Sequence, residues 1–101
     1  MRELTKPELE AMLRSVTPMF FVYQENNDLD KVVILKIREY LYKRESINSA
    51  NEATQEEFYK EATRYYDIFR GHIGDIARSL QTKMILGILE VVYPKLYGGS
   101  K

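Results

Sequence analysis

The chain has 101 residues, no cysteine, and fifteen Lys or Arg balanced by fifteen Asp or Glu. This length fits one domain with a single core. Zero net charge disfavours a free-standing nucleic-acid-binding protein, which normally carries a basic excess. The missing cysteine excludes disulfides, thiol catalysis and thiolate metal sites. The charged N-terminus is unlike a signal peptide and no run of about 18 apolar residues occurs, so we expect a cytoplasmic protein.

The first predicted helix covers residues 6–15. Thr5 and Glu8 form a Thr-x-x-Glu capping box, and Pro7 occupies the first turn, where its missing N–H does no harm. Pro18 is expected to end this segment, because the residue before a proline avoids the helical region. The apolar residues at helical spacing are Leu9, Met12, Leu13 and Val16.

Residues 19–23 form a short apolar run that suits either a strand or one or two helical turns. We favour helix, because the chain offers no second strand to pair with it. A long helix then covers residues 29–44 with Asp28 as its N-cap, and a strand over the β-branched trio at 32–34 is the minor alternative. This helix is predicted to be central and covered on several sides, with its main buried face formed by Leu29, Val33, Ile37, Tyr40 and Leu41.

After a loop at 46–51, a second capping box formed by Thr54 and Glu57 opens another helix. Glu56 and Lys60 are spaced for an i,i+4 ion pair on its polar face. The predicted buried stripe is Phe58, Tyr59, Ala62, Tyr65, Tyr66 and Phe69. Gly71 and Gly74 are expected to interrupt or bend the path.

The last predicted helix covers residues 75–93 and stops at Pro94. Its expected core line is Ile76, Ala77, Leu80, Met84, Ile88 and Val91. The pattern as a whole predicts an all-α fold, a compact bundle of four or five helices in a single domain, with its long helices antiparallel. The bundle domain is expected at residues 1–95 and a flexible C-terminal tail at residues 96–101.

The second half of the last helix is apolar nearly all round, which is more apolar surface than one small core usually takes. We therefore predict a protein interface at Leu86, Leu89 and Tyr93, provided that the first helix does not cover them. The expected partners are other protein subunits of a multi-subunit complex, including copies of this chain, and no membrane.

Basic residues and one tyrosine suggest contact with an RNA or DNA backbone. Lys31, Arg38 and Tyr42 share a face of the helix over 29–44, and Arg78 and Lys83 add cations on the last helix. The leading alternative is that these groups are solvated surface charge.

Catalytic and metal sites are not indicated. His72 is the only histidine, so it lacks the second imidazole or thiolate that a metal site would use, and Asp75 alone is too little to make it catalytic. Glu56 and Glu57 are explained by the helix dipole and the capping box. We expect a protein that is not an enzyme and has no cofactor and no metal.

This chain is small, free of cysteine, helical in pattern and of zero net charge, with scattered basic residues and no catalytic motif. In these features it resembles the small helical subunits of CRISPR Cascade effector complexes, especially those of archaeal type I-A systems. The segment Asp75-Ile-Ala-Arg-Ser-Leu-Gln-Thr-Lys-Met84 looks like the Arg-bearing final helix of such subunits. The resemblance implies a noncatalytic subunit that stacks in several copies along the belly of the complex, braces the crRNA-bearing backbone and contacts target DNA.

A second likeness competes with the first. Phe58-Tyr59 opening a helix, followed by Arg78 and Lys83-Met84, is similar to the helical domain of GINS replication subunits. In that domain the basic residues stand closer together, as Arg-x-x-Lys-Ile, and the loop before them is longer. A small helical regulatory or inhibitor protein is the third alternative.

Overall fold

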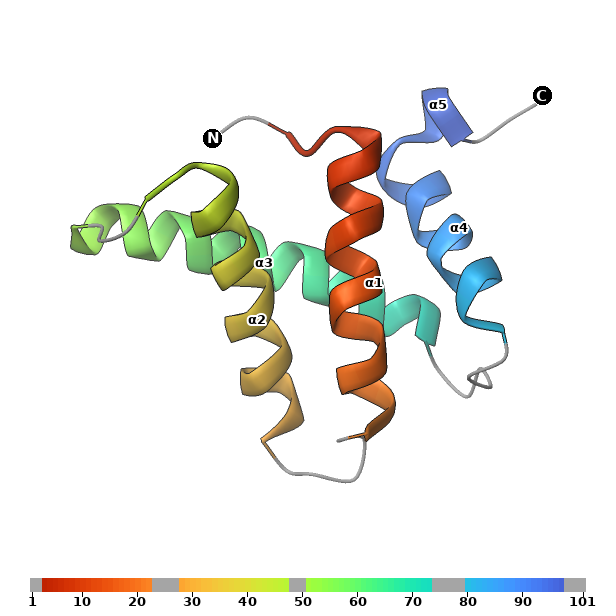
Figure 1. Ribbon diagram of the computed structural model, residues 1–101, viewed down its shortest axis with the longest axis horizontal. Coiled ribbons are helices and arrows are strands. Elements are labelled where there is room, and N and C mark those ends of the chain that lie inside the picture. Colours follow the sequence, from red (N-terminus) through yellow and green to blue (C-terminus); the bar gives the residue numbers. More distant parts are fainter. Residues whose placement is uncertain (1–2, 23–27, 48–50, 74–79, 98–101) are drawn as a thin grey trace.

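Every regular element in the described part of the chain is a helix. The computed structural model describes residues 3–22, 28–47, 51–73 and 80–97 (Figure 1). The helices are α1 (Lys6–Val22), α2 (Leu29–Arg44), α3 (Glu52–Ile73), α4 (Gln81–Val92) and α5 (Pro94–Tyr97). The predicted all-α, single-domain bundle is confirmed.

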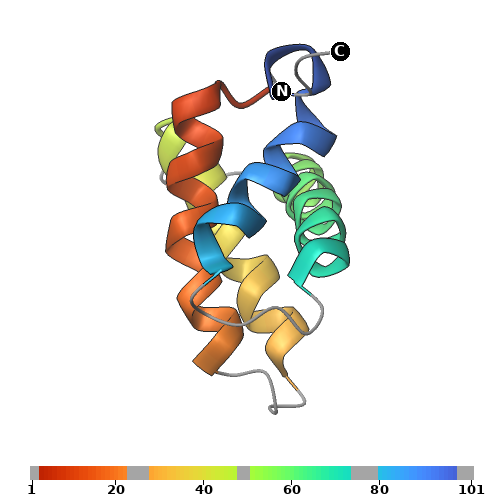
Figure 2. The ribbon, with the colours of Figure 1, turned by 90° about the vertical axis from the view of Figure 1, so that its right-hand side faces the viewer.

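The helices form a thin slab measuring 40 × 35 × 16 Å. Helices α1 and α2 are antiparallel neighbours, as expected, but α3 crosses behind them instead of running alongside (Figure 1). Helix α4 packs against both α1 and α3 and leads into the single turn of α5 (Figure 2). One side of α4 therefore faces the core, and its other side faces outward.

The core lies where α3 crosses the other helices. An edge-to-face contact between Phe20 and Phe69, with ring centroids 5.3 Å apart, joins α1 to α3. Aromatic pairs of this kind contribute about 0.5–1.5 kcal/mol beyond the apolar area that they bury. The largest fully buried side chains are Phe58, Phe69, Leu4, Leu9, Met12, Leu13, Ile37, Leu41, Ile73, Ile88, Leu89 and Val16.

Helix α1 starts as predicted but continues past Pro18, so the expected end of the helix was wrong. The Thr5 N–H donates to Glu8 Oε1 at 2.9 Å, which confirms the capping interaction. A proline inside a helix removes one hydrogen bond. The helix continues because its next turn places Phe20 in the core, 9% exposed and against Phe69.

The N-terminus of α3 is capped three residues before Thr54, the predicted capping residue. Asn51 Oδ1 accepts a hydrogen bond from the Thr54 N–H at 2.8 Å, so Asn51 is the capping residue and Thr54 lies in the first turn. The capping box at Thr54 and Glu57 was therefore misplaced. At α2, Asp28 occupies the N-cap position as predicted, but its side chain makes no capping hydrogen bond.

The predicted buried faces of α2 and α3 are correct except at two tyrosines: Tyr40 on α2 is half-buried, and Tyr59 on α3 is 44% exposed. Gly71 does not interrupt α3, which continues to Ile73. Leu35 on α2 is also 44% exposed, so α2 is covered by α1 and α3 but is open on the face that carries Leu35. Gly74 lies outside the described residues, as do Ile76, Ala77 and the rest of 74–79.

The core line predicted for α4 is half correct. Met84 and Ile88 are buried, together with Ile85 and Leu89, whereas Leu80 and Val91 are 43% and 53% exposed. Helix α4 packs against both α1 and α3, so the buried face is wider than one line of residues at i, i+4 spacing. The positions of α1 and α3 decide which residues of α4 lie at the boundary of that face.

The described part of the predicted tail is ordered. Leu96 and Tyr97 belong to α5, and the Tyr97 hydroxyl donates to Glu10 Oε1 at 3.0 Å. The Lys6 ammonium lies over the Tyr97 ring, 4.4 Å from its centroid. These contacts attach α5 to the first turns of α1, so the boundary at residue 96 was wrong. Residues 98–101 lie outside the described residues.

Candidate functional site

The predicted nucleic-acid group on α2 contains a tyrosine that is already engaged. The Tyr42 ring packs edge-to-face on Phe58 of α3 at 4.6 Å, and the Arg38 guanidinium lies 5.6 Å from the Tyr42 ring centroid. The ring is therefore committed to the contact between α2 and α3, and it does not form the base-stacking surface that the sequence suggested. Lys31 remains exposed, and it makes no ion pair with any described residue.

The basic residues predicted to act together are not all brought together. Lys83 is exposed on α4, which lies on the other flank of α1 from α2 (Figure 1). Arg78 lies outside the described residues. A small hollow of about 190 Å³ between α1 and α2 gathers two further lysines, and it is lined by Ser15, Lys36, Glu39, Tyr40 and Lys43. Lys36 lies 4.0 Å from Glu39, which offsets part of its charge.

The predicted protein interface divides between surface and core. Leu86 is 47% exposed, but Leu89 is fully buried, so the assignment of Leu89 to an interface was wrong. Tyr93 is half-buried, and its pKa is raised by burial and by the nearby Glu3 carboxylate. Helical periodicity could not separate Leu86 from Leu89, because which of the two is covered depends on where α1 crosses.

Two exposed apolar side chains in the same region were missed. Val91 and Leu96 are 53% and 64% exposed, and they lie at the end of α4 and in α5. Between them the chain bends sharply, and the elbow between the two helices forms an open hollow of about 260 Å³. It is lined by Val92, Tyr93, Pro94, Lys95 and Leu96. The signal in the sequence is Pro94 after an apolar helix end; the sequence predicts that it stops the helix, and in the structure it also begins α5.

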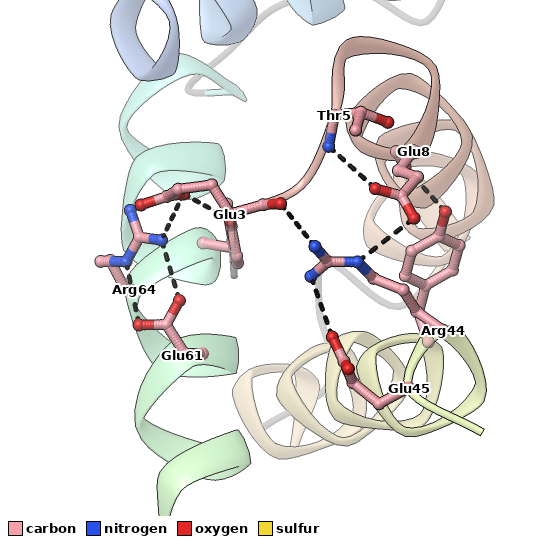
Figure 3. Close-up of polar contacts among 9 residues, drawn as sticks. Glu3, Thr5, Glu8, Arg44, Glu45, Glu61 and Arg64 are labelled. Atoms are coloured by element: carbon pink, nitrogen blue, oxygen red, sulfur yellow. Dashed lines mark hydrogen bonds and ion pairs between the residues drawn. The ribbon is translucent and has the colours of Figure 1, made fainter. Parts of the chain in front are cut away.

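A polar network that sequence reasoning missed fixes the N-terminal segment. The buried Arg44 side chain, only 3% exposed, pairs with Glu8 Oε2 at 3.2 Å and donates to the Glu3 carbonyl oxygen. The Glu3 carboxylate in turn accepts from Arg64 at 3.3 Å (Figure 3). We call Glu3, Glu8, Arg44 and Arg64 the N-terminal clasp.

In and beside the clasp, hydrogen bonding of Arg64 and burial of Tyr65 favour the protonated forms of both side chains. A hydrogen bond at 2.9 Å to Glu61 is the main reason that the pKa of Arg64 is raised above its ordinary value. Burial raises the pKa of the adjacent Tyr65, whose hydroxyl donates to the Glu3 carboxylate at 3.3 Å. Since the clasp residues come from the N-terminal segment, α1, α2 and α3, the network acts as a structural tie (Figure 3).

Catalytic and metal chemistry gain no support from the described residues. His72 is half-buried and packs toward α4, with its Nδ1 placed 3.5 Å from the point where a Cβ on Gly87 would lie. Among the residues described, no group of three or more His, Asp or Glu side chains could hold a metal ion. Over the same residues, none of the helices has the length and apolar character needed to cross a membrane.

The fold and these surfaces define the class as a small all-α bundle whose candidate sites are interaction surfaces. Comparison of the chain with protein-family models, with curated proteins and with solved structures finds no match.

Proposed function

We propose that this protein is a noncatalytic helical subunit of a larger nucleoprotein assembly and that it docks on another subunit through the elbow between α4 and α5. The observation that carries the proposal is the exposed apolar surface at this elbow. Of the large apolar side chains that the structure describes, Leu96 is the most exposed, at 64%, and it borders the hollow of about 260 Å³.

The chemistry of the elbow indicates what kind of group fits it. Burying an aliphatic side chain contributes about 1.5–3 kcal/mol, so one apolar side chain inserted beside Leu96 is a useful anchor. Lys95, on the rim, is exposed and has no ion-pair partner among the described residues. An apolar side chain flanked by a carboxylate therefore matches the site.

The resemblance of the sequence to Cascade small subunits makes a CRISPR effector complex the specific assembly that we propose. Lys31 and Arg38 lie on α2, on the other flank of α1 from α4, so they stay accessible when the elbow is docked (Figure 1). In such a complex these two cations would contact phosphates without reading bases.

The test is to purify the tagged chain from its native host and to quantify the proteins that accompany it. We expect Leu96→Glu to remove a defined partner and Tyr59→Glu to retain it. Tyr59 is the control, because it is an exposed apolar side chain on α3, away from the elbow and from the cations of α2. The melting temperatures of both variants should stay at the wild-type value.

The identity of the accompanying proteins separates the alternatives. CRISPR-associated proteins would support the specific proposal, whereas primase or helicase subunits would replace it with the GINS-like alternative. If both glutamate variants retain the same set of proteins, the elbow is not a docking site.

A further inference from the structure

The outward face of α4 carries two opposite charges that have no partner within the described chain. Lys83 and Glu90 are both exposed and stand seven residues apart, so they lie on the same side of the helix about two turns from each other. Their separation along the axis is about 10 Å, too long for a direct ion pair. No ion pair involving either residue occurs among the residues described.

Between these charges the helix presents one exposed leucine and one glycine. Leu86 is 47% exposed and Gly87 is partly exposed. The opposite face of α4 is covered by α1 and α3, so this strip is the side of the helix that faces outward (Figure 2).

Gly87 borders this strip on the side of α3. A Cβ at this position would meet His72 of the same chain, with its Nδ1 at 3.5 Å, so α3 already covers this side of the helix. The open part of the strip is therefore formed by Lys83, Leu86 and Glu90.

The order of Lys83, Leu86, Gly87 and Glu90 along α4 makes this strip complementary to a second copy of itself under two-fold symmetry. When two such helices pair antiparallel with the axis between Leu86 and Gly87, Lys83 of each copy stands level with Glu90 of the other. The two Leu86 side chains then meet beside the axis. One patch thereby meets itself, as in an isologous dimer.

We propose that the outward face of α4 binds a second copy of this chain in an antiparallel, two-fold pair. Two Lys83–Glu90 ion pairs flank a central contact between the leucines. The elbow used in the proposed function is a different surface, so this inference does not depend on it. Because α4 spans only 12 residues, the interface belongs to the small, transient class, and association is concentration-dependent.

The test uses the purified full-length chain and charge reversal. Lys83→Glu and Glu90→Lys should each weaken self-association by roughly tenfold, since each replaces two attractive pairs with two repulsive ones. Sedimentation equilibrium measures this change. Lys60→Glu is the matched control, because Lys60 is an exposed lysine of α3 outside the strip, and it should leave association unchanged.

The symmetry itself is tested by mixing the two reversed variants. A Lys83→Glu chain presents two glutamates and a Glu90→Lys chain presents two lysines, so the mixture should pair with wild-type affinity, as should the double variant alone. Energy transfer between differently labelled chains reports the mixed pair. An unrelated or parallel interface would not be rescued in this way.

A second variant tests the contact between the leucines. Leu86→Ala should weaken self-association while changing the free energy of unfolding by no more than about 0.5 kcal/mol, because this side chain is exposed. The proposal is overturned if the wild-type chain is monomeric at every accessible concentration. It is equally overturned if the single reversals leave association unchanged, or if their mixture fails to pair.

Discussion

The first half of this molecule, α1 to α3, and the second half, α4 and α5, differ in how much apolar surface they leave exposed. Helices α1, α2 and α3 meet around paired aromatic rings and are tied together by the N-terminal clasp, and their most exposed large apolar side chains among the described residues, Leu35 and Tyr59, are both 44% exposed. The shorter second half leaves Leu86, Val91 and Leu96 at 47%, 53% and 64% exposed. The comparison indicates that the inner face of α4 completes the core, whereas its outer face and α5 are available for binding.

The sharpest test of this division compares two leucines on α4. Leu89→Glu places a charge in a fully buried position and should lower the free energy of unfolding by more than about 4 kcal/mol, enough to unfold a small domain. Leu86→Glu should change it by no more than about 0.5 kcal/mol, because this side chain is exposed. Urea denaturation followed by circular dichroism measures both. Similar losses in the two variants would place Leu86 in the core.

The clasp offers the next largest effect. Arg44→Ala should cost about 2–4 kcal/mol, because it leaves Glu8 and the Glu3 carbonyl without their buried partner. Arg64→Ala should cost less than about 1 kcal/mol, since its side chain is 39% exposed and its ion pairs are screened by solvent. Thermal unfolding of both variants distinguishes them. Equal shifts in melting temperature would mean that burial of Arg44 is not what stabilises the clasp.

Alkaline pH should weaken the first half through Tyr66. Burial, followed by a hydrogen bond to Asp30, raises the pKa of Tyr66 from 10.0 to about 12. Between these two values the unfolded state has released a proton that the folded state still binds. Stability that is present in full below pH 10 is therefore lost as the pH rises toward 12.

Removing the Tyr66 hydroxyl should make the loss of stability at alkaline pH less steep. Tyr66→Phe should lower stability by about 1 kcal/mol near neutral pH, through the lost hydrogen bond, and should reduce the decline above pH 10. Urea midpoints measured below and above pH 10 provide the test. Tyr97→Phe, which cuts the hydroxyl contact between α5 and Glu10, should have a smaller effect near neutral pH, because Tyr97 is only half-buried. If the stability of Tyr66→Phe falls above pH 10 as steeply as that of the wild type, Tyr66 is not the cause of the alkaline decline.

The smallest expected difference concerns the start of α3. Asn51→Ala should cost about 1 kcal/mol, because it removes the side-chain oxygen that accepts from the Thr54 N–H. Thr54→Ala should cost a few tenths of a kcal/mol at most, since alanine is the better helix former in the first turn. The reverse ranking in thermal unfolding would restore the capping box predicted at Thr54.

Agreement between sequence and structure was best where the controlling interactions are local. The helix over 29–44 was predicted with its final bounds, and the Thr5–Glu8 cap and the Glu56–Lys60 pair both form, the latter at 3.9 Å. Each depends on residues within about one helical turn of each other. The exposed site residues were predicted less well, because periodicity shows that a face is apolar and does not show how much of it a neighbour covers.

By itself, the sequence determined that the chain is all-helical and approximately where its long helices lie, since capping and helical periodicity act over three to seven residues. Only the tertiary structure decided that α1 continues through Pro18, that Leu89 is buried while Val91 is exposed, and that Tyr97 returns to Glu10. The pairing of Arg44 with Glu3 and Glu8 was decided in the same way, because it joins residues 41 and 36 positions apart. Such contacts form only after the helices have packed, because many different packings are compatible with the same local pattern.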